Sequence, residues 1–123
     1  MLTLIARHRC EPVVRVCIGL GELLDEDGRV FVSCLECARH LDAAGSHVDL
    51  DDFLGDIDRI FRIEHLADTR LREVSALALA EARDFRELHL ATRLADVLEN
   101  ASDSLAHAAQ LLRRYVLEEV MQR

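Results

Sequence analysis

The sequence has few aromatic residues, almost no proline and no long apolar run. Aromatic residues make up 4% of the 123 residues, tryptophan is absent, and there are five glycines and one proline. Leucine and alanine dominate together with arginine, glutamate and aspartate, a composition typical of an α-helical bundle and not of a sheet protein. A chain of this length is one domain that can bury a single helical core.

Positive charge is also scarce. The formal net charge is −8, and the arginines are scattered among acids instead of forming a patch. A nucleic-acid partner is therefore excluded, because phosphate backbones require a basic face. No apolar run approaches the ~20 residues of a membrane span. In the opening MLTLIARHR the charges follow the apolar part, which is the wrong order for a secretory signal. We therefore expect a cytoplasmic protein.

Four cysteines lie in the first third of the chain, at Cys10, Cys17, Cys34 and Cys37. The segment CLEC is a C-x-x-C motif, but a second such motif is missing, so a zinc site built from the four is the minor alternative. We interpret Cys17 and Cys34 as small core residues and Cys37 as a cytoplasmic thiol. Nothing in their spacing indicates a disulfide framework.

Residues 1–48 are expected to hold two shorter helices. The first starts at Pro12, a residue suited to a first helical turn, and ends before DEDG at 25–28, which is a turn signal. The second covers 29–44 and is closed by the glycine that follows it. A strand over VVRVCI is the minority alternative.

Residues 49–121 predict a long helical hairpin. Its first helix is capped by Asp49, and its second begins at Asp84-Phe-Arg-Glu87, a capping-box pattern. One continuous helix across this point is the competing interpretation. Both helices would be roughly 50 Å long and would project beyond the shorter ones. The sequence thus predicts an all-α fold, a single domain over 1–123 that forms an antiparallel three- to four-helix bundle.

Four acids inside the hairpin indicate a metal site. Glu64 and Asp68 are spaced i, i+4, as are Glu99 and Asp103, so each pair lies on one helix face. Both cross-pairs sum to 167, so one register brings Asp68 level with Glu99 and Glu64 level with Asp103. Glu64 falls in the apolar stripe of its helix, and the others border the stripes. Facing carboxylates in a bundle interior repel and lose hydration unless they are protonated or bind cations.

Oxygen ligands suit magnesium, manganese, iron or zinc, and the pattern does not choose among them. His107, four residues after Asp103, is a further candidate ligand, although an ordinary surface histidine is the favoured interpretation. A ferritin-like di-iron enzyme needs Glu-x-x-His on two helices, and this motif is absent. Because no phosphate-binding loop or nucleophile with a base appears either, we predict that the protein is not an enzyme. Equally spaced acids at Asp52 and Asp56 lie off the stripe and are interpreted as solvated.

The segment LENASDSLAHAAQLLRRYV resembles the closing helix of PhoU-like proteins, and IEHLAD resembles the acidic motif of the preceding helix. The resemblance covers residues 50–121. It implies a three-helix module whose two [Glu/Asp]-x-x-x-Asp motifs bind a multinuclear metal cluster. Metal ligation thereby carries over to Glu64, Asp68, Glu99 and Asp103. Typical members carry two modules, whereas this chain has one set of motifs.

The resemblance also implies a function. We expect a metal-binding, non-enzymatic regulator of phosphate transport that contacts a phosphate transporter, either a Pit-type permease or an ABC system, or its signalling partner. Such a protein would be peripheral to the inner membrane face and would form a homo-oligomer that imitates the two-module arrangement. The alternatives are a metal-free helical oligomerisation or adaptor module and, less favoured, a carboxylate-bridged metalloprotein.

Overall fold

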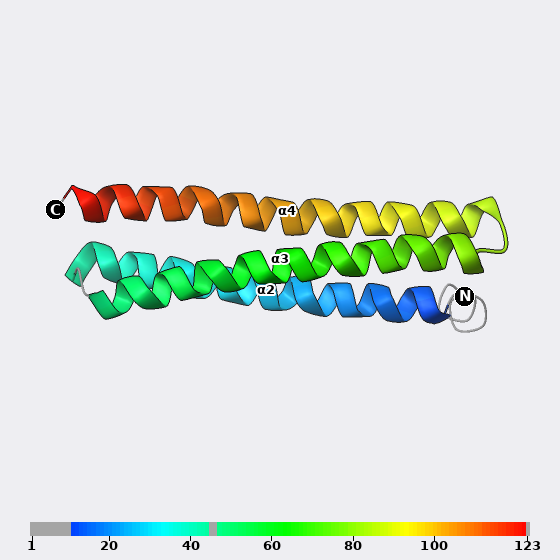
Figure 1. The fold of residues 1–123 in the computed structure, drawn as a ribbon, viewed down its shortest axis with the longest axis horizontal. Coiled ribbons are helices and arrows are strands. Elements are labelled where there is room, and N and C mark those ends of the chain that lie inside the picture. The colour runs from blue at the N-terminus through cyan, green and yellow to red at the C-terminus, as the bar shows by residue number, and fades with distance from the viewer. Residues whose placement is uncertain (1–10, 45–46, 123) are drawn as a thin grey trace.

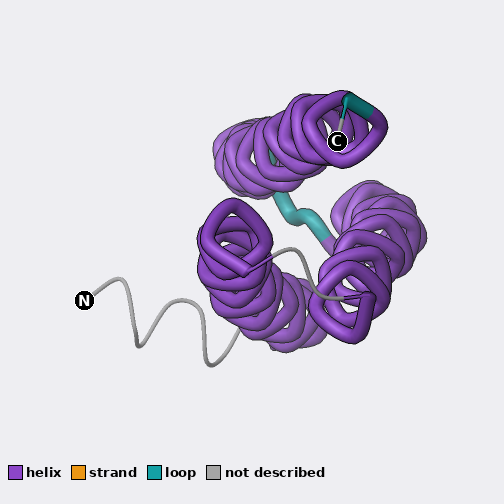
Figure 2. The backbone as a smooth tube through the Cα atoms, turned by 90° about the vertical axis from the view of Figure 1, so that its left-hand side faces the viewer, coloured by secondary structure: helices purple, strands orange, loops and turns teal. Residues whose placement is uncertain are grey.

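Three long helices form the structure, a computed structural model that describes residues 11–44 and 47–122. They are α2 (Glu11–Ala44), α3 (His47–Glu81) and α4 (Phe85–Met121). The helices run side by side and alternate in direction (Figure 1), and seen along the bundle they occupy the corners of a triangle (Figure 2). The described residues contain no strand. The all-α bundle is thus confirmed.

The first helix differs from the prediction, because α2 is one helix and not two. It continues through 25–28, where a turn was expected. Leu20, Asp27, Cys34 and Leu41, spaced seven apart, are all buried, and this spacing keeps one face of an unbroken helix against its neighbours. The burial of that face outweighs the weak helix propensity of Gly28. With 34 residues, α2 matches the 35 of α3 and the 37 of α4, so the expected projection of the hairpin is wrong.

The hairpin itself is close to the prediction. Helix α3 begins at His47, two residues earlier than expected, and Asp49 lies in its first turn instead of capping it. An acid there still favours the helix, because the N-terminal end of the dipole is positive. Asp84 caps α4: its Oδ1 accepts the backbone N–H of Glu87 at 2.9 Å, and Glu87 Oε2 accepts that of Arg83 at 3.0 Å. The continuous helix is therefore excluded.

The core is divided into two apolar clusters along the bundle. The long cluster has nine buried residues: Val30, Cys34, Leu41, Phe53, Ile57, Ile60, Ile63, Ala109 and Val116. The short cluster has five: Leu20, Ala67, Leu71, Val74 and Ala95. Between them, each helix contributes polar side chains, which we call the polar layer: Asp27, Glu64, Asp68, Ser102 and Asp103. Asp27 and Ser102 are the two polar residues that the described part of the chain buries.

The cysteines occupy packed positions on α2. Cys34 belongs to the long cluster and Cys17 packs against the short one. Seventeen residues of continuous helix separate them by ~25 Å, so the four-cysteine zinc site is wrong. Burial, and then the nearby charge of Asp56, raise the pKa of Cys34 to about 12, which keeps its thiol protonated. Cys37 is partly buried, and Cys10 lies outside the described residues.

Among the described residues, no helix combines the length and the apolar character that crossing a membrane requires.

Candidate metal site

Three of the four predicted acids meet at one point of the bundle. Glu64 and Asp68 come from α3 and Asp103 from α4, and one carboxylate oxygen of each lies within 4.8 Å of the others. Two oxygens that each bind one ion at ~2.0–2.6 Å are at most ~4–5 Å apart. The three carboxylates therefore stand at the separation that one shared cation requires. The predicted pairing of Glu64 with Asp103 is found.

Glu99 and His107 lie outside this group. Glu99 is exposed and, with Asp68, Arg72 and Asp96, lines a shallow hollow between α3 and α4. Asp68 and Glu99 thus lie at the same level, as the register predicts, but Glu99 is not one of the three acids that converge. His107 is exposed on the next turn of α4 and is also outside this group.

The negative charges of the other two acids act on Glu64. Its pKa is raised first by partial burial and then by the charges of Asp68 and Asp103, while His65 acts in the opposite sense. A raised carboxyl pKa means that the surroundings disfavour the ionised form. A cation among the three carboxylates would reverse this effect, because it favours their ionised state.

Asp27, which the sequence analysis missed, brings a fourth carboxylate from α2. Its side chain is fully buried, and neither Oδ1 nor Oδ2 has a hydrogen-bond partner. Burial, followed by the charges of Glu64 and Glu26, raises its pKa from 3.8 to about 6. Asp27 is thus near enough to Glu64 for the two charges to interact, although it is not one of the three acids that converge. Buried polar groups in folded proteins almost always have a partner, so two orphaned carboxylate oxygens need an explanation.

Ser102 adds a second buried polar atom without a partner. Its side chain is 3% exposed, it precedes Asp103 on α4, and its Oγ makes no hydrogen bond. A hydroxyl oxygen can accept a hydrogen bond from a bound water or ligate a hard cation. All three helices therefore contribute oxygen atoms to one level of the bundle.

Asp27 escaped prediction because of its immediate neighbours. In DEDG, a glycine follows three acids, and this local pattern indicates a turn. The pattern that would have found Asp27 is longer: it stands seven residues after Leu20 and seven before Cys34. Such spacing places it on the same helical face as two core residues.

Comparisons with known proteins provide no assignment: no family model, no curated protein and no solved structure matches this chain.

Proposed function

We propose that this bundle binds a metal cation in its polar layer, with Glu64, Asp68 and Asp103 as ligands and Asp27 as the carboxylate behind them. The observation that carries the proposal is the side chain of Asp27, which is fully buried with both oxygens unpartnered and interacts electrostatically with Glu64, one of the three converging acids. The competing explanation, that the acids are solvated surface charge, does not account for a buried carboxylate without a partner. A cation offsets the desolvation and mutual repulsion of these groups.

The chemistry of the site limits the class of cation. The donors are carboxylates together with the nearby hydroxyl of Ser102, all hard oxygen atoms. Such donors suit magnesium, manganese, iron and zinc, and not soft ions such as copper(I). These side chains lie on three separate helices. A bound cation would link α3 to α4 directly, and its positive charge would offset the negative charge of Asp27 on α2.

Metal analysis and thermal unfolding test this proposal together. The purified protein should contain metal, and removing it with EDTA should lower Tm, because a ligand that binds only the folded state stabilises by about 2.7 kcal/mol at 100 times its Kd. The variant Glu64→Gln/Asp103→Asn should lose the metal, and its Tm should not respond to EDTA. Its metal-free form should be at least as stable as the metal-free wild type, because two repelling charges are gone.

A matched control removes the same charge elsewhere. Asp51 and Asp58 are exposed on α3, and Asp51→Asn/Asp58→Asn should keep both the metal and the response to EDTA. Mn²⁺, Zn²⁺, Fe²⁺ and Mg²⁺, added singly to the metal-free protein, identify the preferred ion. A wild type that holds no metal, gains none and melts identically with and without EDTA would defeat the proposal.

A regulator of phosphate transport remains the proposed physiological role. It is supported by the two motifs, Glu64-x-x-x-Asp68 and Glu99-x-x-x-Asp103, and by the three-helix arrangement in which they lie. Binding to the Pit-type permease or ABC phosphate transporter of the source organism, reconstituted in nanodiscs, tests it. We expect the wild type to bind the transporter and the Glu64→Gln/Asp103→Asn variant not to bind it. Absence of binding to both transporters would contradict the role.

The homo-oligomer also stays a prediction. Because α2 is as long as the hairpin helices, no projecting helix ends favour association. The prediction of a homo-oligomer therefore depends only on the presence of a single set of motifs. Light scattering at micromolar concentration tests it directly, and a monomer would be the contrary result.

A further inference from the structure

Helix α4 carries a second apolar stripe, which lies on its flank outside the core. Its positions alternate by four and three residues, and we call them the outer stripe: Leu90, Leu94, Val97, Ala101, Ser104, Ala108, Leu111 and Tyr115. The five large side chains among them are each between 46% and 56% exposed. The one polar member, Ser104, has its hydrogen-bond donor satisfied within the helix, because its hydroxyl donates to the Asn100 carbonyl at 2.7 Å. A stripe of this period is the surface that packs against another helix.

The outer stripe is distinct from the face that builds the bundle. Leu94, Ala101 and Tyr115 each immediately precede a buried residue of α4, so they lie about 100° round the helix from the core. Core packing therefore does not explain them. Single exposed apolar side chains are common, but a contiguous row along a helix marks an interaction site.

Apolar side chains continue onto the neighbouring flank of α2. Contacts of Glu26 with Arg59 and of Ser33 with Asp56 show which side of α2 faces α3. By helical periodicity, Phe31 and Leu35 lie on the opposite flank, toward α4. Phe31 is partly buried and Leu35 is 45% exposed. A helix on the outer stripe would thus also contact α2 and complete a four-helix arrangement.

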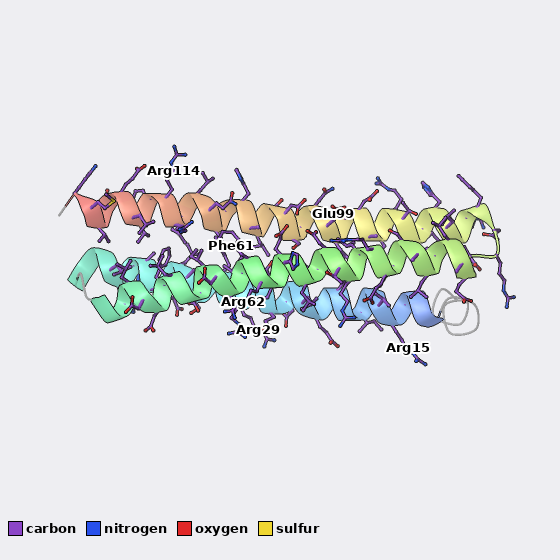
Figure 3. The ribbon with its side chains drawn as sticks, in the orientation of Figure 1. Arg15, Arg29, Phe61, Arg62, Glu99 and Arg114 are labelled. Carbon is purple, nitrogen blue, oxygen red and sulfur yellow. The ribbon has the colours of Figure 1, made fainter. Side chains whose placement is uncertain are left out.

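One edge of the outer stripe is basic although the whole protein is acidic. Positions spaced by seven residues along this edge hold Arg86, Arg93, Asn100, His107 and Arg114, all exposed. Arg114 extends away from α2 and α3 (Figure 3), and its Nε lies 3.7 Å from Oε1 of Glu118 in an exposed ion pair on the same helix. The opposite edge holds residues that pack toward the core, such as Leu98 and Leu112. In paired helices the residues that flank the stripe choose the partner by charge.

This edge disfavours two occupants that the chain itself could supply. A second copy packed antiparallel on the stripe would place Arg93 beside Arg114 of its mate, and a parallel copy would place the basic edge against leucines. Arginines placed side by side repel each other, and arginines placed against leucines lose hydration without gaining a partner. Residues 1–10 carry Arg7, His8 and Arg9, the wrong sign. As a helix they would span at most ~15 Å, less than half of the ~37 Å from Leu90 to Tyr115.

We propose that the outer stripe binds an amphipathic helix of another protein, one with an apolar face flanked by acidic residues. Its apolar side chains fill the row from Leu90 to Tyr115, and its acids lie along the edge formed by Arg86, Arg93 and Arg114. The surface does not include the carboxylates of the polar layer, so this inference stands independently of the cation.

Two synthetic probes test the proposal. Each is a fluorescein-labelled 28-residue helix with leucine and alanine at the face positions, flanked by glutamate in one peptide and by lysine in the other. The flanking charges keep each peptide from pairing with itself. In fluorescence anisotropy at physiological ionic strength, where the overall negative charge of the protein is screened, the glutamate peptide should bind the full-length protein about tenfold more tightly than the lysine peptide, the sum of a few exposed ion pairs.

Variants distinguish this surface from others. Leu94→Asp/Leu111→Asp should abolish binding, whereas the control Leu66→Asp/Leu79→Asp, exposed residues of α3, should leave it unchanged. Arg86→Glu/Arg93→Glu should reverse the preference to the lysine peptide. Circular dichroism verifies that every variant is folded.

The proposal is overturned if neither peptide binds, or if both bind equally. It is also overturned if sedimentation shows that the protein alone self-associates and that Leu94→Asp/Leu111→Asp makes it monomeric, because the stripe would then belong to a second copy.

Discussion

Asp27 is the residue at which the physical demands on this bundle conflict. Its position on α2 between Leu20 and Cys34 belongs to the core, yet its side chain ionises near neutral pH and has no hydrogen-bond partner. A leucine there would join the two apolar clusters into one core. A carboxylate in that place lowers stability unless something binds it.

The first prediction concerns the pH dependence that Asp27 creates. Its pKa is about 6 in the folded protein, against 3.8 ordinarily. Between these values the folded state holds a proton that the unfolded chain releases, so the free energy of unfolding falls as pH rises from about 4 to 6. Two pKa units correspond to about 3 kcal/mol. In EDTA, Asp27→Asn should shrink the difference in Tm between pH 4.5 and pH 7.5.

The neighbours of Asp27 define the control. Glu64 faces it from α3, Glu26 precedes it, and both charges act on Asp27 in the same sense as burial. Because the pKa of Glu64 is also raised, part of the pH dependence should remain in the variant. Asp58→Asn, at an exposed position of α3, should retain all of it. A variant Asp27→Asn with the wild-type pH profile would contradict the assignment.

At the level of single residues, the sequence predicted the cluster of carboxylates in part. Glu64, Asp68 and Asp103 were found because their spacing and register follow from helical geometry alone. The exclusion of Glu99 from the cluster depends on how far α4 is rotated about its axis, and Asp27 depends on the path of α2. Neither quantity is encoded in the local pattern around the residue concerned.

Among the elements, α2 departs furthest from its sequence pattern. The capping residues Asp84 and Glu87 fixed the hairpin boundary, because a cap is a local interaction between nearby atoms. The continuity of α2 is instead a tertiary effect, in which packing of the buried face overrides glycines and a run of acids. Local sequence patterns therefore predicted the boundary between α3 and α4 correctly, but they also predicted a turn at 25–28 that α2 does not contain.

A second prediction follows from the glycines of α2. Apart from the adjacent backbone of α2, added Cβ atoms at Gly21 and Gly28 would meet no atom within 4 Å. Alanine inside a helix is more stable than glycine by about 1 kcal/mol. Gly21→Ala/Gly28→Ala should therefore raise the free energy of unfolding by about 2 kcal/mol, measured by urea denaturation.

The same variant also tests the continuity of α2. If the chain turned at 25–28, Gly28 would take the left-handed conformation common after a helix, and alanine there would destabilise the protein. Gly55→Ala in α3, where an added Cβ likewise meets nothing, provides a stabilising control outside α2. Loss of stability in the α2 variant alone would therefore argue for a break.

The molecule as a whole is built from neighbours in sequence. Helix α2 packs on α3, and α3 packs on α4. Each of these pairs is joined by a connection of a few residues. A fold of this kind was predictable because its register follows from where the helices end. The outer stripe of α4 is a property of the same level, since its significance appears only once the face that packs against α2 and α3 is known.

The division of the core into two clusters has a consequence for cooperativity. The short cluster contains five buried residues, two of them alanines, and the polar layer separates it from the nine of the long cluster. Apolar burial is what couples parts of a chain into a single unfolding unit. In the cation-free protein, amide hydrogens around Leu71 and Val74 should thus exchange by a local opening that leaves those around Ile57 and Ile60 protected. A cation held across the layer would join the two ends, so that their exchange rates converge and the bundle opens as one body.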